Sequence, residues 1–281
     1  MNNDKKFDKI CDDIKELKIQ GATNIAIAAV KAYSIKPEKN SIKQLISLRP
    51  TEPALRNALN FAQKNDNNIK EALNHLKKAR DKVAEYGSKL VKNNSIVYTH
   101  CHSSSVIKAL KKAKKSGKKF EVYCTETRPF LQGRITATDL ANAGIKVTMF
   151  IDSAMRQAIK NADICFLGAD AITADLKIIN KIGSELAAET AEKFNVPLYI
   201  LTDSWKFDPK TLYGREEKIE ERSYSEVWKN PPKGVSIHNY AFEKIDYRLV
   251  KGIATELGII KPKDFIFVTL KKYPWMKERG D

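Results

Sequence analysis

The sequence predicts an α/β protein in which an all-helical N-terminal region precedes a doubly wound, mostly parallel sheet. Residues 4–92 carry apolar side chains at helical spacing almost throughout. From residue 95 onward, short β-branched and aromatic runs alternate with helical patterns, which is typical of a parallel sheet with helices on both faces. The change near residue 93 predicts two domains, residues 1–92 and residues 93–281.

Breaks in the helical pattern divide the N-terminal region into successive helices. Gly and Pro interrupt helices because Gly costs backbone entropy and Pro lacks an amide donor. Such breaks occur at Gly21-Ala22, at Pro37 and across residues 49–53. The intervals between them predict three helices, and two more helices follow over residues 54–63 and 67–92.

Short apolar runs predict the strands of the sheet, and they lie at residues 96–99, 120–125, 147–151, 164–168 and 198–202. Helical patterns separate each pair of runs. The charged segment 206–236 contains Pro209, Pro231 and Pro232 and predicts no regular element. Residues 245–272 fit either two helices or a strand and a helix.

The composition is that of a soluble globular protein. The 281 residues are 42% hydrophobic and 30% charged, and no apolar run approaches the roughly 18 to 20 residues of a membrane span. The N-terminal residues lack the apolar core of a signal peptide. The four Cys residues are scattered without CxxC spacing, which argues against a zinc ribbon and a disulfide framework. We therefore expect a reduced, cytoplasmic protein without membrane contact.

The net charge of +16 raises the question of nucleic-acid binding. Most of the excess is Lys spread through helical segments, as in residues 108–119. Such runs are usually solvated helix faces, so direct nucleic-acid binding is not expected. A small anionic substrate would be attracted by the same field.

Reactive side chains follow the predicted strands. His100, Cys101 and His102 come directly after the first strand, and Asp170 follows the fourth. Ligands bind at the carboxyl ends of strands in open α/β sheets. Cys101 is either a small buried apolar residue or a reactive thiol, since the start of a helix favours thiolate. Asp170 is either a partner acid or base or an ordinary cap.

A second group of residues could hold phosphate. The segment Asn180-Lys-Ile-Gly183 precedes a helix predicted over about residues 184–194, and a helix N-terminus beside a cation binds phosphate oxygens well. Arg49, Arg128 and Lys206 are further possible contacts, although each alone is more often a surface charge. No P-loop, GxGxxG, HExxH or GxSxG pattern occurs, so no cofactor and no metal is predicted.

These segments occur in an order that resembles the sugar-phosphate isomerase branch of the translation initiation factor 2B family. The segments are Thr99-His-Cys-His-Ser103, Thr125-Glu-Thr-Arg-Pro-Phe-Leu-Gln-Gly133, Gly168-Ala-Asp170, Asn180-Lys-Ile-Gly183 and Lys206-Phe207, with Gly21-Ala22 and Arg49-Pro-Thr51 upstream. The family includes methylthioribose-1-phosphate isomerase, archaeal ribose-1,5-bisphosphate isomerase and the α, β and δ regulatory subunits of the exchange factor. The resemblance implies a helical domain followed by a Rossmann-like domain, with a strand at residues 248–255.

The resemblance also implies an activity. The isomerases of this family carry a Cys in the first loop and an Asp in the Gly-Ala-Asp loop, a pair that the exchange-factor subunits typically lack; this chain has Cys101 and Asp170. It therefore resembles an aldose–ketose isomerase that converts ribose 1,5-bisphosphate to ribulose 1,5-bisphosphate in AMP and nucleoside breakdown. Cys101 as thiolate would take the C2 proton and Asp170 would donate a proton. Implied substrate contacts are Gln20, Gly21, Ala22, Thr23, Arg49, Ser103, Ser104, Ser105, Asn180, Lys181 and Lys206.

Three positions depart from the pattern of the bisphosphate enzymes: Gln20, Thr23 and Ser104 replace an Arg, a Gly and a Lys. The alternative is a regulatory subunit that binds initiation factor 2 and senses sugar phosphates or nucleotides. A methylthioribose-phosphate isomerase fits less well, because Lys206-Phe207 and the residues after Cys101 match the bisphosphate branch better. In either case the family implies a homo-oligomer, a dimer or a hexamer built from dimers.

Overall fold

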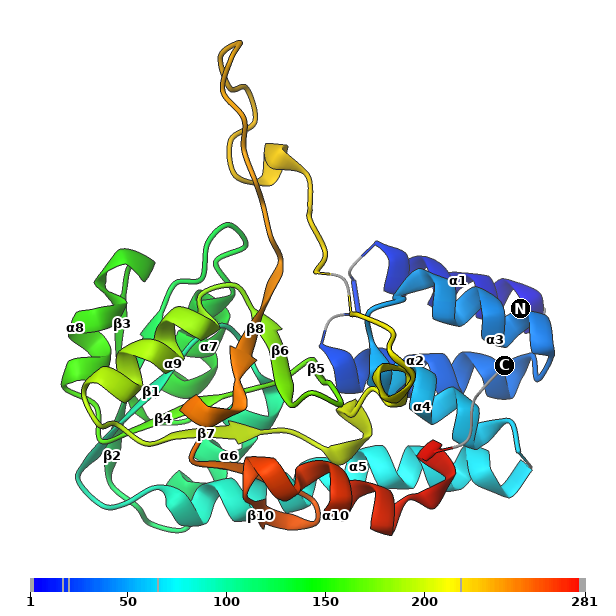
Figure 1. Ribbon diagram of the computed structural model, residues 1–281, viewed down its shortest axis with the longest axis horizontal. Helices are drawn as coiled ribbons and strands as arrows, with labels where there is room; N and C mark the ends of the chain where they lie inside the picture. The colour runs from blue at the N-terminus through cyan, green and yellow to red at the C-terminus, as the bar shows by residue number, and fades with distance from the viewer. Residues whose placement is uncertain (1–2, 17, 20, 65, 218, 278–281) are drawn as a thin grey trace.

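The computed structural model describes residues 3–277 apart from 17, 20, 65 and 218. Five helices form the N-terminal region: α1 (Asn3–Lys15), α2 (Ala22–Ile35), α3 (Lys39–Leu48), α4 (Pro53–Ala62) and α5 (Asp66–Leu90). The first four gather on one side of the molecule, and α5 runs from them beneath the sheet (Figure 1). The predicted breaks at Gly21-Ala22, Pro37 and residues 49–53 coincide with the junctions between helices, with Ala22 and Pro53 as the first residues of α2 and α4.

A seven-stranded sheet follows, in the order β10-β9-β7-β4-β1-β2-β3. Its strands are β1 (Ser95–Thr99), β2 (Phe120–Thr125), β3 (Lys146–Phe150), β4 (Ile164–Leu167), β7 (Leu198–Leu201), β9 (Gly252–Thr255) and β10 (Gly258–Ile260). All neighbouring pairs are parallel except β9 with β10. The chain runs outward from β1 to β3 and then returns to place β4 on the other side of β1. The order in which strands are added to the sheet therefore reverses between β1 and β4. In sheets of this kind, ligands bind at that switch point.

Helices cover both faces of this sheet. Besides α5, they are α6 (Ser104–Lys115), α7 (Gln132–Ala141), α8 (Met155–Lys160), α9 (Ser184–Lys193) and α10 (Phe265–Lys272). Alternate strand residues enter two separate apolar clusters: Val97 packs with α5 and α6, whereas its neighbour Tyr98 joins the cluster that contains α8 and α9. Burial on both faces explains why the central strands β1, β4 and β7 read as largely apolar runs. No helix in the described part of the chain is long and apolar enough to cross a bilayer.

A second, three-stranded antiparallel sheet lies beside the first, in the order β5-β6-β8. It contains β5 (Ala171–Ile172), β6 (Lys177–Lys181) and β8 (Phe242–Asp246). Between β7 and β8 the chain passes through the short 3-10 helices η2 (Ser204–Lys206) and η3 (Pro209–Tyr213) and then rises as a long arm away from the body (Figure 1). The two limbs of the arm pair at Glu221 and Tyr240.

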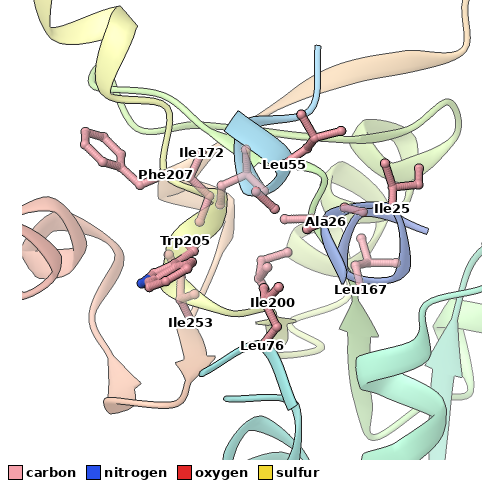
Figure 2. Packing of buried hydrophobic residues seen from close by; sticks show 14 of the residues in the cluster. Ile25, Ala26, Leu55, Leu76, Leu167, Ile172, Ile200, Trp205, Phe207 and Ile253 are labelled. Atoms are coloured by element: carbon pink, nitrogen blue, oxygen red, sulfur yellow. The ribbon is translucent and has the colours of Figure 1, made fainter. Parts of the chain in front are cut away.

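One apolar cluster connects the N-terminal helices to the sheet. Figure 2 shows Ile25 of α2, Leu55 of α4 and Leu76 of α5 gathered around Ile200 of β7 and Trp205 of η2. Trp205 is among the largest fully buried side chains. Burying large apolar side chains stabilises a protein by about 1.5–3 kcal/mol each, so this shared core fixes the helices against the loops that follow the strands. The division at residues 92 and 93 stays a prediction.

The predicted α/β class and the mostly parallel sheet are confirmed, and the five predicted strands correspond to β1, β2, β3, β4 and β7. The expected strand at 248–255 is shorter, because Tyr247–Leu249 forms a 3-10 turn before β9. The small sheet was not predicted, since β6 pairs with β8 more than 60 residues later in the chain. A pairing of that separation leaves no local pattern.

Candidate active site

A cavity of ≈ 540 Å³ opens where the N-terminal helices meet the loops at the carboxyl edge of the sheet. Its size is that of a small-molecule site. The described residues that line it include the cations Lys18, Arg49, Lys181, Lys206 and Arg222 and the acids Glu52, Asp170 and Glu220. More cations than carboxylates face the cavity, so it favours an anionic ligand.

Cys101 sits at the β1 end of the cavity in a left-handed backbone conformation, with φ 64°. Its amide donates to Thr127 Oγ1 at 3.0 Å, and its carbonyl accepts from Thr136 Oγ1 at 2.7 Å. The thiol donates to Gln132 Oε1 at 3.4 Å. Left-handed backbone is costly for a residue with a Cβ, and these side chains from the 125–136 segment hold Cys101 in it.

Burial raises the pKa of the Cys101 thiol to about 11, and the nearby Lys181 ammonium opposes that rise. Burial disfavours the charged form of an acid, and this effect outweighs the helix field that led us to expect a thiolate. Burial therefore keeps Cys101 in the thiol form at neutral pH. Any step that uses thiolate depends on positive charge close to the sulfur.

His100 connects three loops around Cys101. Its Nε2–H donates to the carbonyl of Ile182 at 2.7 Å, so its Nδ1 accepts from Thr125 Oγ1 at 2.6 Å. Burial lowers the pKa of the imidazole, in keeping with this neutral form. A Cβ on Gly183, which has φ 96°, would lie 2.7 Å from His100 Nε2. Only glycine meets both the backbone conformation and this close approach.

His102 is also held by a hydroxyl, with its Nδ1 3.0 Å from Thr136 Oγ1. Both histidines thus hold the loop that carries Cys101 through contacts with protein groups. Thr125 and Thr136 come from β2 and α7, the strand that pairs with β1 and the helix that follows it. The two histidines therefore orient this loop.

Asp170 lies opposite, on the loop that follows β4. Its amide donates to the carbonyl of Ile179 at 2.8 Å, which ties the loop to the small sheet. Gly168 in the same loop lies against Ser103, since a Cβ there would come within 2.6 Å of Ser103 Oγ. The loops after β1 and β4 are therefore in direct contact, and both Cys101 and Asp170 line the cavity.

The Asn180–Gly183 segment and η2 supply polar groups on a third side. Asn180 Nδ2 donates to Ser184 Oγ at 2.8 Å, in the first turn of α9. Lys181 Nζ lies 4.8 Å from the centre of the Phe242 ring. Lys206 Nζ donates to the carbonyl of Ala169 at 2.5 Å, directly beside Asp170. The two lysines bring positive charge to both members of the predicted pair.

The N-terminal helices fix the position of Lys206. Asn57 on α4 donates from Nδ2 to the carbonyls of Trp205 at 2.7 Å and Phe207 at 2.8 Å. Next to it, Arg56 Nη2 lies 2.8 Å from Asp208 Oδ2, and both side chains are almost fully buried. Two backbone carbonyls on either side of Lys206 and the side chain of Asp208 are thus held by α4. This link between α4 and η2 could not be foreseen from residues that lie about 150 positions apart.

The structure brings most of the predicted substrate contacts together. The residues that line the cavity are Gly21, Ala22, Thr23, Arg49, Ser103, Ser104, Asn180, Lys181 and Lys206, with Cys101 and Asp170. Ser105 is buried one position further into α6 and is not among the lining residues. Gln20 lies outside the described residues. Arg128 lines a smaller neighbouring pocket, where its Nη2 donates to the carbonyl of Val227 at 3.4 Å.

Several lining residues were not predicted. Glu52 belongs to the 49–53 segment, in which Arg49 was a predicted phosphate contact and Glu52 had no predicted role. Arg222 comes from the arm, and its guanidinium carbon lies 5.0 Å from the centre of the Phe130 ring. A charged segment with prolines carries no signal that it returns to the site. Gln132 lies within the segment Thr125–Gly133, but only the turn at residues 127–131 brings its side chain to the Cys101 thiol.

Known proteins resemble this chain over most of its length. The model of the family described as "Initiation factor 2 subunit family" matches residues 18–262. The protein named ribose 1,5-bisphosphate isomerase of Methanocaldococcus jannaschii is 36% identical, over 95% of each chain. A putative translation initiation factor eIF-2B subunit 2-like protein of Pyrococcus furiosus is 29% identical, over 93% of this chain and 99% of its own. The crystal structure of the Pyrococcus horikoshii OT3 translation initiation factor eIF-2B superposes with a TM-score of 0.83 at 26% identity, covering 92% of this chain and 98% of that chain.

Proposed function

The chain belongs to the initiation factor 2 subunit family, and on that basis we propose that it is an aldose–ketose isomerase that converts ribose 1,5-bisphosphate to ribulose 1,5-bisphosphate. The observation that carries this proposal is the placement of Cys101 and Asp170 on adjacent loops that line one cation-rich cavity. The similarity to a protein named for this reaction supports the substrate.

The chemistry accounts for a paired acid and base. A pentose with phosphate on its anomeric oxygen cannot open to a free aldehyde, so the ring must open as a proton leaves C2. Cys101 as thiolate takes the C2 proton, the bond between C1 and the ring oxygen breaks, and Asp170 donates a proton to that oxygen. The resulting enol phosphate gains a proton at C1 and loses one from the C2 hydroxyl, which leaves the ketone. Positioned proton transfers of this kind contribute about 10²–10⁴-fold each.

The remaining polar groups hold the sugar phosphate. Lys181 and Lys206 flank the reacting groups, and Arg49 enters from the helical side. Charge-assisted hydrogen bonds to such cations are worth about 1.5–3 kcal/mol each. Gly21, Ala22 and Thr23 offer the first turn of α2, where backbone amides point toward an anion. Ser103, Ser104 and Asn180 complete the set of hydroxyl and amide partners, and we also assign Gln20 to it.

The proposal is tested by incubating the purified protein with ribose 1,5-bisphosphate and measuring ribulose 1,5-bisphosphate. We expect conversion of this compound and little conversion of methylthioribose 1-phosphate, which lacks the second phosphate. Absence of turnover with every ribose 1-phosphate tried would reject the isomerase. Preferred turnover of methylthioribose 1-phosphate would assign the chain to that reaction.

The turnover number at saturating substrate should rise with pH. Burial places the pKa of the Cys101 thiol at about 11, and the thiolate fraction of a group below its pKa grows about tenfold per pH unit. We therefore expect kcat to increase from pH 7 to pH 9 by up to about tenfold per unit. A kcat that stays constant over this range would instead indicate that the thiol, which remains protonated below its pKa, is the proton donor and that Asp170 is the base. Steady-state assays over the pH range distinguish these two assignments.

A regulatory subunit that binds initiation factor 2 is the second candidate, and the similarity to an eIF-2B structure favours it. Such a protein would keep the cavity as a sensor of sugar phosphates or nucleotides. Association with purified initiation factor 2, together with absence of isomerase turnover, would support this function.

We also propose that the protein forms a homo-oligomer, either a dimer or a hexamer built from dimers. Light scattering would measure the mass of the oligomer directly.

A further inference from the structure

Glu52 is a buried acid on the wall of the cavity. It lies at the turn between α3 and α4, and its side chain is 4% exposed. Although it occupies the N-cap position of α4, its carboxyl does not cap the helix. Its Oε1 accepts from Arg49 Nη2 at 3.2 Å, whereas its Oε2 is buried and has no hydrogen-bond partner among the described residues. A buried carboxyl oxygen without a partner is costly.

The charges around Glu52 come from three elements. Arg49 precedes α4, Asp170 follows β4, and Lys206 belongs to η2. Burial and the charge of Asp170 raise the pKa of Glu52 to about 7, while Arg49 and Lys206 oppose that rise. Glu52 therefore changes charge close to neutral pH, in contact with a cation that we assign to substrate phosphate.

We propose that Glu52 takes up a proton on its free oxygen when phosphate binds at Arg49, and then donates that proton as a hydrogen bond to the phosphate. This role rests on the proposed sugar-phosphate site. An ionised Glu52 would repel a phosphate dianion and compete with it for Arg49. The neutral acid keeps its Oε1 bond to Arg49 and offers an O–H donor from Oε2, so one proton replaces repulsion with a contact.

The sign of the pH dependence follows from this exchange. Above pH 7 the free protein has an ionised Glu52, so binding must take a proton from solution. Affinity then falls as pH rises, by about tenfold per pH unit. Between pH 7.5 and 9 a sugar phosphate stays dianionic, since its second pKa is about 6. The Cys101 thiol, with a pKa of about 11, stays protonated over most of the same range.

Ribose 5-phosphate is a suitable probe because its binding can be measured without turnover. Isothermal titration at pH 7.5, 8.25 and 9 should show affinity for the wild-type protein falling by about tenfold per pH unit. For Glu52→Gln we expect less than about threefold change over the whole range and tighter binding than wild type at pH 9. Titrations at pH 8 in buffers of different ionisation enthalpy should show uptake of about one proton by wild type and almost none by Glu52→Gln.

Glu220→Gln is the matched control, because Glu220 lines the same cavity but is paired with Arg222 at 3.0 Å on the more exposed arm. It should keep the wild-type pH dependence and proton uptake. Binding of ribose 5-phosphate with the same pH dependence in wild type and Glu52→Gln would contradict the role of Glu52 and leave the proposed function intact. If the pH dependence of affinity changed equally in Glu52→Gln and Glu220→Gln, the role of Glu52 would also be contradicted. The change would then reflect only the total charge of the protein. Absence of binding by all three proteins would contradict the phosphate site itself and this role with it.

Discussion

Replacing Cys101 with Ser should lower kcat by about 10²–10⁴-fold while leaving the fold intact. The serine hydroxyl has nearly the size of the thiol, but it cannot form an anion near neutral pH. The backbone contacts of residue 101 with Thr127 and Thr136 do not involve the side chain, so they remain. Asp170→Asn should lose activity to a similar extent, because the amide cannot donate or accept the proton. Steady-state assays of purified variants measure both losses.

The effects of Cys101→Ser and Asp170→Asn on kcat should not be additive. Residues that act in one proton-transfer sequence depend on each other, so the double variant should be about as slow as the slower single variant. Cys11→Ser and Asp139→Asn are matched controls: Cys11 is buried in α1 outside the cavity lining, and Asp139 pairs with Lys111 on α6. Circular dichroism would confirm that each protein is folded. Retention of more than about a tenth of wild-type kcat by Cys101→Ser would rule out the thiol as the base.

Arg56→Met should destabilise the protein by about 3–5 kcal/mol, the usual cost of breaking a buried ion pair on one side. The substitution leaves the fully buried Asp208 without its cation, and it also removes the donor to the carbonyl of Pro50. Glu217 is buried beside the pair, and burial together with Asp208 raises its pKa to about 7. Chemical denaturation at pH 8 would give the change in the free energy of unfolding.

The loss of unfolding free energy caused by Arg56→Met should be smaller at pH 5.5 than at pH 8. The folded-state pKa of Glu217 lies above its ordinary value of 4.5, so the folded protein binds more protons than the unfolded chain and is stabilised as pH falls. In Arg56→Met the dependence of stability on pH becomes steeper, because the buried carboxyls of Asp208 and Glu217 both lose the nearby Arg56 cation. Lys146→Met is the control, since Lys146 pairs with Glu121 at the surface with a side chain that is 77% exposed; it should cost less than about 1 kcal/mol. If Arg56→Met and Lys146→Met lowered the free energy of unfolding equally, the buried pair of Arg56 and Asp208 would not contribute more to stability than a surface pair.

Local patterns in the sequence were enough for most of the secondary structure. Helices α2 and α3 end two residues before Pro37 and Pro50, and the central strands are buried on both faces, so each is visible in a short window. The loops that carry Cys101 and Asp170 followed from the same reasoning. Parallel strands place their carboxyl ends at one edge, and the position of β4 beside β1 brings these two loops into contact.

Contacts between distant segments could not be foreseen in the same way. The antiparallel pairing of β6 with β8 and the hydrogen bonds from Asn57 to the η2 segment join residues far apart in the chain. The environment of Cys101 is a second example: the field of a helix start is visible in the sequence, whereas the extent of burial that raises the thiol pKa is not. Glu52 is a third, because only the folded chain brings it beside Asp170 and Lys206.

The cavity lining extends along the chain from Lys18 to Phe242. During synthesis, a growing chain can therefore form its first helices and central strands long before it holds a complete site. Contacts of such long sequence separation form slowly, because the entropy of closing long loops must be overcome first. After dilution from denaturant, enzymatic activity should thus return with the slowest long-range docking step, later than the helical signal in circular dichroism. Activity in this protein reports on the completion of folding.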